Sequence, residues 1–329
     1  MSEVKEFKIL SIDGGGIKGL YASTILRHLE EKFNCRISDY FDLLCGTSTG
    51  GLIALALSQK ITAERICSFY VQEGPKIFPK TGKTAGFLKQ ALWKGKYSDR
   101  HLKQALASIF GNKLIGDSHN LLCIPSYSIT HADNIVFKYD HAEGDLSRDN
   151  KLKYVDVALA TSAAPTYFPV AEIGAFHGGQ FIDGGVWGNN PTLVALIEAL
   201  KYFVTGDRFN KIRILSISCI NLYEGKPKVN RNRSFRHWQS ALFQTSITGQ
   251  SSFVNYFMES ITESLRFPVD YVRIPSEKVS AGQEHLIQLD VATGEALNMI
   301  LALGDRAAEI QKKRPEIMSF FDQKKLYTI

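Results

Sequence analysis

Residues 41–57 read FDLLCGTSTGGLIALAL, and this stretch decides the fold class. Phe41–Cys45 is a short apolar strand, Gly46–Gly51 forms a sharp turn, and Leu52–Leu57 opens a helix. Upstream, residues 7–12 (FKILSI) suit a buried strand, which a glycine-rich turn and a second apolar-faced helix follow. Two consecutive strand-turn-helix units imply two parallel strands, because parallel neighbours need a crossover between them.

The alternation of strands and helices continues downstream. We expect strands at Leu121–Ile129, Ile135–Tyr139 and Ile212–Ser218, and helices at residues 62–74, 99–110, 155–161, 191–203, 242–265 and 293–310, the last capped by Thr293. Asn190 and Pro191 favour a helix start, because asparagine caps helices and proline suits the first helical position. No fixed-period repeat or linker divides the chain, so we expect residues 1–329 to form one domain. The sequence predicts an α/β fold with a mainly parallel central sheet and helices on both faces.

Composition limits the classes of function. No run approaches the roughly 20 apolar residues that span a bilayer, and the N-terminus MSEVKEFKIL lacks a secretory signal. We therefore expect a cytoplasmic protein for which any membrane contact is peripheral. The net charge of +6 favours anionic lipid or phosphate ligands, but no motif for a nucleic acid polymer is present. The five cysteines are scattered without metal-ligand spacing, so we expect reduced core thiols and no metal.

The strongest chemical signal is the GTSTG motif at 46–50. This GxSxG sequence lies where a strand ends and a helix begins, which is the context of a nucleophilic serine. The motif therefore predicts Ser48 as a nucleophile, and Gly46 and Gly50 leave room for a tight turn. The positive end of the following helix would stabilise negative charge that develops there. The alternative is an ordinary glycine turn with a surface serine.

A second signal, DGGGIKG at 13–19, has two functional interpretations. Gly14, Gly16 and Gly19 match the GxGxxG pattern of dinucleotide sites, and Asp39 follows at about the distance of a ribose-binding acid. That acid should end the second strand, but Asp39 precedes it and the strand ends in GTSTG instead. A nucleotide-binding oxidoreductase thus stays an alternative that lacks its acid.

The second interpretation of this loop is an oxyanion hole. The amides of Gly15 and Gly16 would point at a tetrahedral intermediate on Ser48, and one such donor is worth about 3 kcal/mol of transition-state stabilisation. Lys18 would flank this loop and hold either the loop or an anionic headgroup. The alternative for Lys18 is a solvated surface lysine.

A third signal is Asp183, which follows an apolar strand and precedes Gly184 and Gly185. A carboxylate at a strand end can bond a serine hydroxyl directly and act as its base. An aspartate with a pKa near 4 is a weak base, so this role requires a raised pKa or a strongly shared proton. A bare Asp-Gly pair is otherwise a turn.

Together, DGGGIKG (13–19), GTSTGG (46–51) and IDGG (182–185) resemble the three motifs of the patatin-like phospholipases, in that family's order. The similarity extends to ATSAAPTYFP (160–169) and DGGVWGNNPT (183–192). It covers residues 8 to about 200 and thins afterwards, so residues 201–329 are less typical of the family.

The resemblance implies a three-layer α/β fold and a Ser-Asp dyad that needs no metal or organic cofactor. Ser48 would attack an ester carbonyl of a glycerophospholipid at the bilayer surface. Asp183 would take the serine proton and later activate water, and the amides of Gly14, Gly15 and Gly16 would stabilise the oxyanion.

The chain departs from the plant patatins after residue 200, where the strand 212–218 runs into Cys219-Ile220-Asn221 in place of a glycine-rich turn. It is more similar to bacterial stand-alone members, including the CapV-type phospholipases that act in anti-phage signalling when a cyclic dinucleotide binds. This implies a cyclic dinucleotide as an activator. Positive charges beside an aromatic suit its phosphates and a stacked base, or equally anionic headgroups: Lys226, Lys228, Arg231, Arg233, Arg236 and Trp238.

The same residues also fit functions that need no Ser-Asp dyad. An α/β-hydrolase triad would use Ser48, Asp183 and a late histidine, His237 or His285. A catalytically silent, ligand-sensing protein would keep the fold without turnover.

Two later segments also have structural alternatives. A solvated basic loop accounts equally well for residues 224–237, and the region 242–265 is either a core-packing helix or a membrane-binding face.

Overall fold

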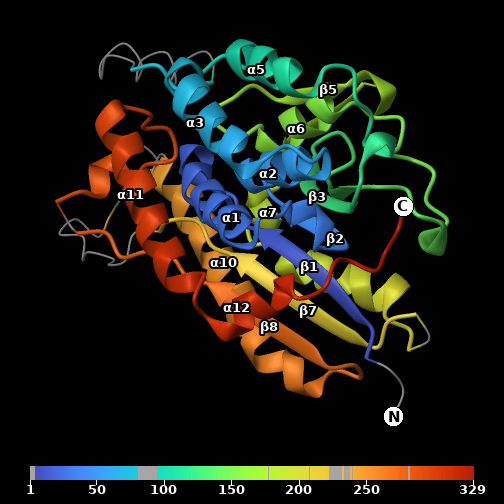
Figure 1. The fold of residues 1–329 in the computed structure, drawn as a ribbon. Helices are drawn as coiled ribbons and strands as arrows, with labels where there is room; N and C mark the ends of the chain where they lie inside the picture. Colours follow the sequence, from blue (N-terminus) through green and yellow to red (C-terminus); the bar gives the residue numbers. More distant parts are fainter. Residues whose placement is uncertain are drawn as a thin grey trace.

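A computed structural model describes residues 4–80, 95–176, 178–206, 208–221, 232, 238, 240–280 and 282–329. In these ranges one eight-stranded sheet runs through the centre, in the order β5-β6-β3-β2-β1-β7-β8, with β4 paired to β3 (Figure 1). Helices lie on both of its faces. This arrangement confirms the predicted α/β fold class.

Most neighbouring strands are parallel, as predicted. The parallel strands are β3 (Leu121–Ser128), β2 (Leu43–Gly46), β1 (Glu6–Ile12), β7 (Lys211–Ile217) and β8 (Val269–Ile274). The antiparallel strands are β4 (Asp133–Lys138), β6 (Gly179–Asp183) and β5 (Ala171–Ile173). Because β7 and β8 extend the sheet from β1, the part of the chain after residue 200 completes the same sheet as the family motifs.

The period-2 alternation of β1 explains the three layers. Leu10 and Ile12 face one core cluster, whereas Phe7 and Ile9 face a second cluster on the opposite side of the sheet. The first cluster packs under α1 (Gly19–Phe33), α2 (Thr49–Ser58), α3 (Ala63–Ile77), α5 (Arg100–Phe110), α6 (Tyr154–Ser162) and α11 (Gly294–Gln311). The second packs under α8 (Thr192–Glu198) and α10 (Ser240–Ile261).

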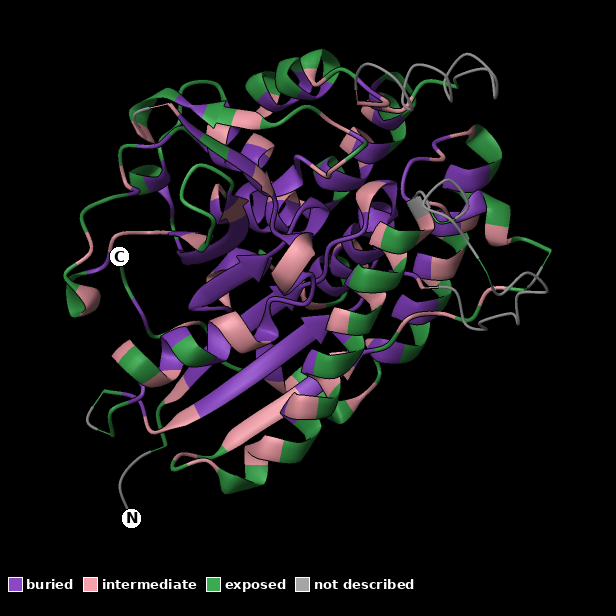
Figure 2. Ribbon diagram, turned by 180° about the vertical axis from the view of Figure 1, so that it is seen from behind, coloured by how far each residue is buried: buried purple, intermediate pink, exposed green. Residues whose placement is uncertain are grey.

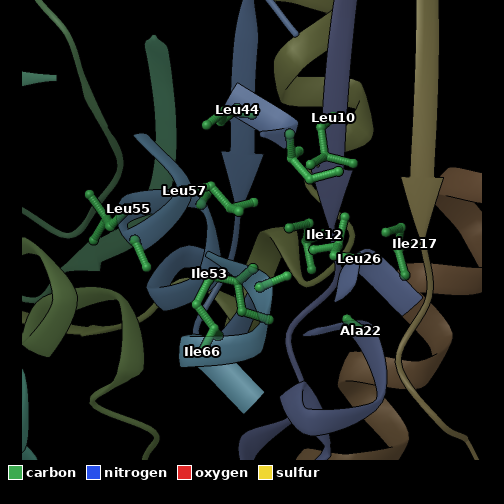
Figure 3. Close-up of a cluster of buried hydrophobic side chains, with 14 of the residues drawn as sticks. Leu10, Ile12, Ala22, Leu26, Leu44, Ile53, Leu55, Leu57, Ile66 and Ile217 are labelled. Carbon is green, nitrogen blue, oxygen red and sulfur yellow. The ribbon is translucent and has the colours of Figure 1, made fainter. Parts of the chain in front are cut away.

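Both core clusters are closed to solvent. Figure 3 shows side chains from β1, β2, β7, α1, α2 and α3 converging in the first cluster. Figure 2 shows the central strands buried and the outer surfaces of the helices exposed. The central strands and the glycine turns that follow them are therefore buried in the closely packed core.

Helix starts are close to their predicted positions. The helix expected from residue 191 begins at Thr192 with Pro191 as its cap, although Asn190 Oδ1 accepts from the amide of Thr192 at 3.1 Å. It continues beyond Glu198 as a π-helical turn, Ala199–Phe203. Thr293 caps α11 by accepting from the amide of Ala296 at 3.2 Å, as predicted.

A short helix, α12 (Pro315–Met318), follows α11, which we expected to be the last. All five cysteines are free thiols, and only Cys35 is partly exposed. Within the described ranges, no helix combines the length and apolar character needed to cross a bilayer. The helix α10 buries Val254 and Met258 and leaves Phe253 and Tyr256 exposed, so it packs on the core and also presents apolar side chains to solvent.

The pairing of β3 brings two distant chain segments together. β2 pairs with residues 121–123 of β3 and β6 pairs with residues 126–128, while β4 occupies the other edge along 123–128. β2 and β6 therefore lie end to end on one edge of β3. Since β2 is parallel and β6 antiparallel to β3, their C-terminal ends approach each other, and Ser48 and Asp183 lie at that junction.

Candidate active site

Ser48 occupies a strained turn between β2 and α2. Its φ of 54° and ψ of −123° lie in a region that side chains other than glycine rarely adopt. The backbone amide of Ser48 donates to the hydroxyl of Thr161 at 3.0 Å, which helps to hold the turn. The serine is 8% exposed and sits at the amino end of α2. This is the geometry expected of a nucleophile elbow.

The glycines of the motifs allow close approach of neighbouring chain. A Cβ atom on Gly50 would lie 2.2 Å from the carbonyl oxygen of Ile12, so no larger residue fits between the elbow and β1. Three other motif glycines are equally enclosed, namely Gly19, Gly46 and Gly184, whereas a Cβ on Gly185 would lie 3.0 Å from its nearest neighbour. The motif glycines are therefore part of the packing that shapes the elbow.

Asp183 is the carboxylate nearest to the nucleophile. It ends β6, is 2% exposed, accepts a hydrogen bond from the amide of Gly185 at 2.7 Å, and lies beside Ser48 on the wall of one cavity. Burial raises the pKa of Asp183 to about 7, although the Ser48 hydroxyl and the Gly185 amide oppose the shift. The raised pKa that a base in this position requires is therefore present.

The glycine-rich loop lies beside the serine, and its three amides differ. The amide of Gly14 donates to the carbonyl of Asn189 at 3.0 Å, so this amide is already committed, contrary to its expected share in an oxyanion hole. The amides of Gly15 and Gly16 have no acceptor among the described residues. Gly16 has a φ of +60° and a Cβ there would lie 2.2 Å from the carbonyl oxygen of Leu289, so glycine is required.

An apolar cavity opens from these groups. Ser48, Asp183, Gly15 and Gly16 lie on its wall, and most of the remaining lining is aliphatic or aromatic: Ile17, Leu52, Phe69, Ile77, Phe78, Leu102, Tyr167, Phe168, Phe243, Ile247 and Leu289. Such a lining suits a hydrocarbon chain attached to a polar reacting group. Within the described ranges, no cluster of three or more His, Cys, Asp or Glu side chains is arranged to hold a metal.

The family model for patatin-like phospholipases matches residues 10–196, which is more than half of the chain. The chain belongs to the patatin-like phospholipase family. It is thus a member of a class of carboxylic ester hydrolases, and this membership argues against the oxidoreductase alternative.

Two curated relatives match nearly the whole of this patatin-like phospholipase. The cGAMP-activated phospholipase of Pseudomonas aeruginosa is 31% identical and covers 94% of this chain and 90% of its own length. Patatin-like protein 2 of Arabidopsis thaliana is 29% identical and covers 93% of this chain and 83% of its own. Among solved structures, VipD from Legionella pneumophila covers 97% of this chain and 67% of its own at 11% identity, with a TM-score of 0.38.

Lys18 is not a surface lysine. Only 7% of it is exposed, and its ammonium donates to the carbonyl of Ile220 at 2.7 Å. Next to this contact, a Cβ on Gly15 would lie 2.0 Å from the sulfur of Cys219. Of the two functions predicted for Lys18, the structure supports holding the loop. The glycine-rich loop thus contacts Cys219 and Ile220, in the segment where the sequence departs from the plant patatins.

An ion pair that no sequence motif indicates lies behind the loop. The carboxylate of Asp13 pairs with the guanidinium of Arg273 on β8, with contacts of 3.2 and 2.6 Å. Arg273 also donates to the hydroxyl of Ser216 at 2.6 Å. The sequence carries no local signal for this pair, because the partners are 260 residues apart. The pair ties the start of the loop to the far strand of the sheet.

Thr161 and Asn189 are two further positioning residues. Thr161 accepts from the amide of Ser48 and donates to the carbonyl of Pro125 at 2.6 Å. The side-chain amide of Asn189 donates to the hydroxyl of Ser251 at 2.9 Å, and its main-chain carbonyl accepts from the amide of Gly14. Both lie in stretches that resemble the family, ATSAAPTYFP and DGGVWGNNPT, so their importance was indicated but their roles were not.

The described part of the chain offers no histidine to complete a triad. None of the described histidines, including His285, lines the cavity, and His237 lies outside the described residues. No acid lies where a ribose-binding acid should, at the carboxyl end of β2. Asp39 ends a 3-10 turn before β2, and Asp42 also precedes this strand, at its amino end. The basic loop residues Lys226, Lys228, Arg231, Arg233 and Arg236 lie outside the described residues, whereas Trp238 is described.

Proposed function

We propose that this chain cleaves glycerophospholipid esters through a Ser48-Asp183 dyad, acting peripherally on the inner membrane from the cytoplasm. The observation that carries the proposal is the position of Asp183, a buried carboxylate whose pKa is raised to about 7, beside Ser48 on the wall of one cavity. A base with a pKa near the operating pH is the most effective in proton transfer. The apolar cavity beside the dyad has the chemistry of an acyl-chain site.

The proposed reaction has two steps. In the first, Asp183 accepts the proton of Ser48 as Oγ attacks the ester carbonyl, and the negative oxygen faces the amides of Gly15 and Gly16. The tetrahedral intermediate collapses, Asp183 gives its proton to the departing lysolipid oxygen, and an acyl-serine remains. In the second step Asp183 takes a proton from water, the hydroxide attacks the acyl-serine, and the fatty acid leaves as Ser48 regains its proton.

We also propose that a cyclic dinucleotide activates this phospholipase in anti-phage defence. The support is the relative from Pseudomonas aeruginosa, which is described as cGAMP-activated and matches 94% of this chain. The positive charge of the predicted basic loop, residues 224–237, suits a phosphate ligand.

The test is fatty-acid release from liposomes of bacterial phospholipids. Wild type and Ser48→Ala are compared, each alone and with a panel of cyclic dinucleotides that includes cGAMP. Release by wild type only, and only with one dinucleotide, is the expected result. Constitutive Ser48-dependent release would support the hydrolase and contradict the activation. No release, together with no labelling by a fluorophosphonate, would favour a catalytically silent, ligand-sensing protein.

A further inference from the structure

A second apolar cavity lies next to the active-site cavity. The two share Leu52, Phe69 and Tyr70 on their walls. Apart from Arg65, every residue that lines the second cavity is aliphatic or aromatic. Side chains that belong to the walls of two neighbouring cavities form the partition between them.

The two cavities follow one another along the same groove between helices. On α2, Ser48 and Leu52 border the first cavity, and Leu52 and Ala56 border the second. On α5, Leu102 borders the first and Leu106 the second. Residues four apart lie on one helix face and are separated by about 6 Å along the axis. The second cavity is therefore displaced from the first by about one helical turn along the groove, with the shared side chains between them.

The three partition residues differ in how firmly they are held. Tyr70 is buried, and its hydroxyl forms hydrogen bonds with two atoms of Thr49. One is the Thr49 hydroxyl and the other is the Thr49 carbonyl oxygen, at 3.3 Å. Leu52 and Phe69 are only partly buried and make no polar contact that would fix them. Hydrogen bonds therefore hold Tyr70 in place. Leu52 and Phe69 form the part of the partition that a substitution can remove.

We infer that Leu52 and Phe69 set the length of the acyl chain that this enzyme accepts, and that the second cavity is a closed extension of the acyl site. The inference rests on the proposed function, because the chain that enters the groove is the one whose ester carbonyl lies at Ser48. A chain that stops at Leu52 is shorter by several methylene groups than one that reaches Ala56. Each methylene that becomes buried improves binding by roughly fourfold.

The experiment measures kcat/KM for 4-nitrophenyl esters from octanoate to stearate, in the presence of any activating dinucleotide. Leu52→Ala and Phe69→Ala should each raise the ratio of stearate to octanoate hydrolysis by about tenfold or more over wild type, because the additional methylenes enter the second cavity. Adding Ala56→Leu to Leu52→Ala refills the opened space and should return the ratio toward the wild-type value.

Leu106→Ala is the matched control. It removes the same side chain from the second cavity but leaves the partition in place, so the ratio should stay within about twofold of wild type, well short of the roughly fourfold gained from a single buried methylene. An unchanged ratio in Leu52→Ala and Phe69→Ala, or an equal rise in Leu106→Ala, would overturn the inference.

A binding measurement separates this inference from the proposed function. Isothermal titration calorimetry measures the affinities of octanoate and stearate for two variants, Ser48→Ala and the double variant Ser48→Ala with Leu52→Ala. A gain for stearate over octanoate in the double variant supports the extension even if no variant turns over, in which case only the proposed function fails. If the ratio of stearate to octanoate affinity is the same in both variants, the extension is contradicted, even when wild type hydrolyses esters.

Discussion

The two ends of the central sheet each hold a buried aspartate, and these aspartates are bonded very differently. At the amino end, the carboxylate of Asp42 accepts from the amides of Lys8, Leu326 and Tyr327 at 2.7 to 3.0 Å. At the carboxyl end, Asp183 accepts from one amide, that of Gly185, and lies beside the Ser48 hydroxyl. Burial raises the pKa of both groups.

The difference separates a structural carboxylate from a reactive one. Three amides occupy Asp42 and tie the C-terminal segment to β1, so this group has little capacity left for chemistry. Asp183 has fewer amide donors, and beside it lies the hydroxyl whose proton it would take. An incompletely satisfied buried carboxylate costs stability and gains basicity, which is the usual compromise of a catalytic site.

The largest expected effect separates the two aspartates by activity. Ser48→Ala and Asp183→Ala should each lower kcat/KM by about a thousandfold or more, because the nucleophile or its base is lost. Asp42→Asn should leave the activity of the folded fraction nearly unchanged. Fatty-acid release per active molecule measures this, with His285→Ala as a further control. Loss of activity in a folded His285→Ala variant would contradict the dyad and revive a triad.

The second effect separates them by stability. Asp42→Ala should lower the free energy of unfolding by about 3–5 kcal/mol, because three buried amides lose their acceptor. Urea denaturation at pH 7 measures the change. Asp183→Ala, which leaves only one amide without an acceptor, should cost clearly less. Equal losses in the two variants would remove the distinction between a structural and a reactive carboxylate.

The third effect concerns pH. The pKa of Asp183 is about 7 in the folded protein and near 4 in the unfolded chain, so the folded state holds a proton that the unfolded state releases between these values. Stability from this group is therefore present below pH 4 and is lost as the pH rises through 7. Asp183→Asn should raise the free energy of unfolding by on the order of 2–4 kcal/mol at pH 8 and by little at pH 4. A stabilisation that is equal at both pH values would show that its origin is not the buried charge.

The smallest effect concerns the support of the elbow. Thr161→Val removes the acceptor for the amide of Ser48 and should lower kcat by about tenfold, because the serine loses its position. Thr161→Ser keeps the hydroxyl and should retain most of the activity. A matched loss in both variants would indicate that packing of the Thr161 methyl group, not its hydrogen bond, supports the turn.

Much of the fold followed from local patterns. The apolar run at residues 7–12 predicted the buried strand β1, and the apolar-faced segment after the first glycine-rich turn predicted α1. The GxSxG motif predicted an elbow at Ser48, and its backbone has the strained φ of such a turn. These predictions succeeded because strand periodicity, helix periodicity and turn chemistry depend on residues close together in the sequence.

The details of the site did not follow in the same way. The commitment of the Gly14 amide to Asn189, the burial of Lys18 against Ile220 and the pairing of Asp13 with Arg273 all join distant segments. No short-range pattern encodes which of three neighbouring glycines keeps a free amide. Local motifs could not predict these contacts. The contacts depend on how β7, β8, α7 (Gly185–Gly188) and α8 pack around the glycine-rich loop.

By itself, the sequence determined the parallel strand-turn-helix units, the serine at the elbow and the presence of an aspartate at a later strand end. Only the tertiary structure decided that these two residues meet, because β2 and β6 occupy the same edge of β3 from opposite directions. It also decided that Leu52 and Phe69 divide one groove into two cavities. The physical reason is that propensity and periodicity are local, whereas strand order and cavity shape arise from contacts between residues far apart in the chain.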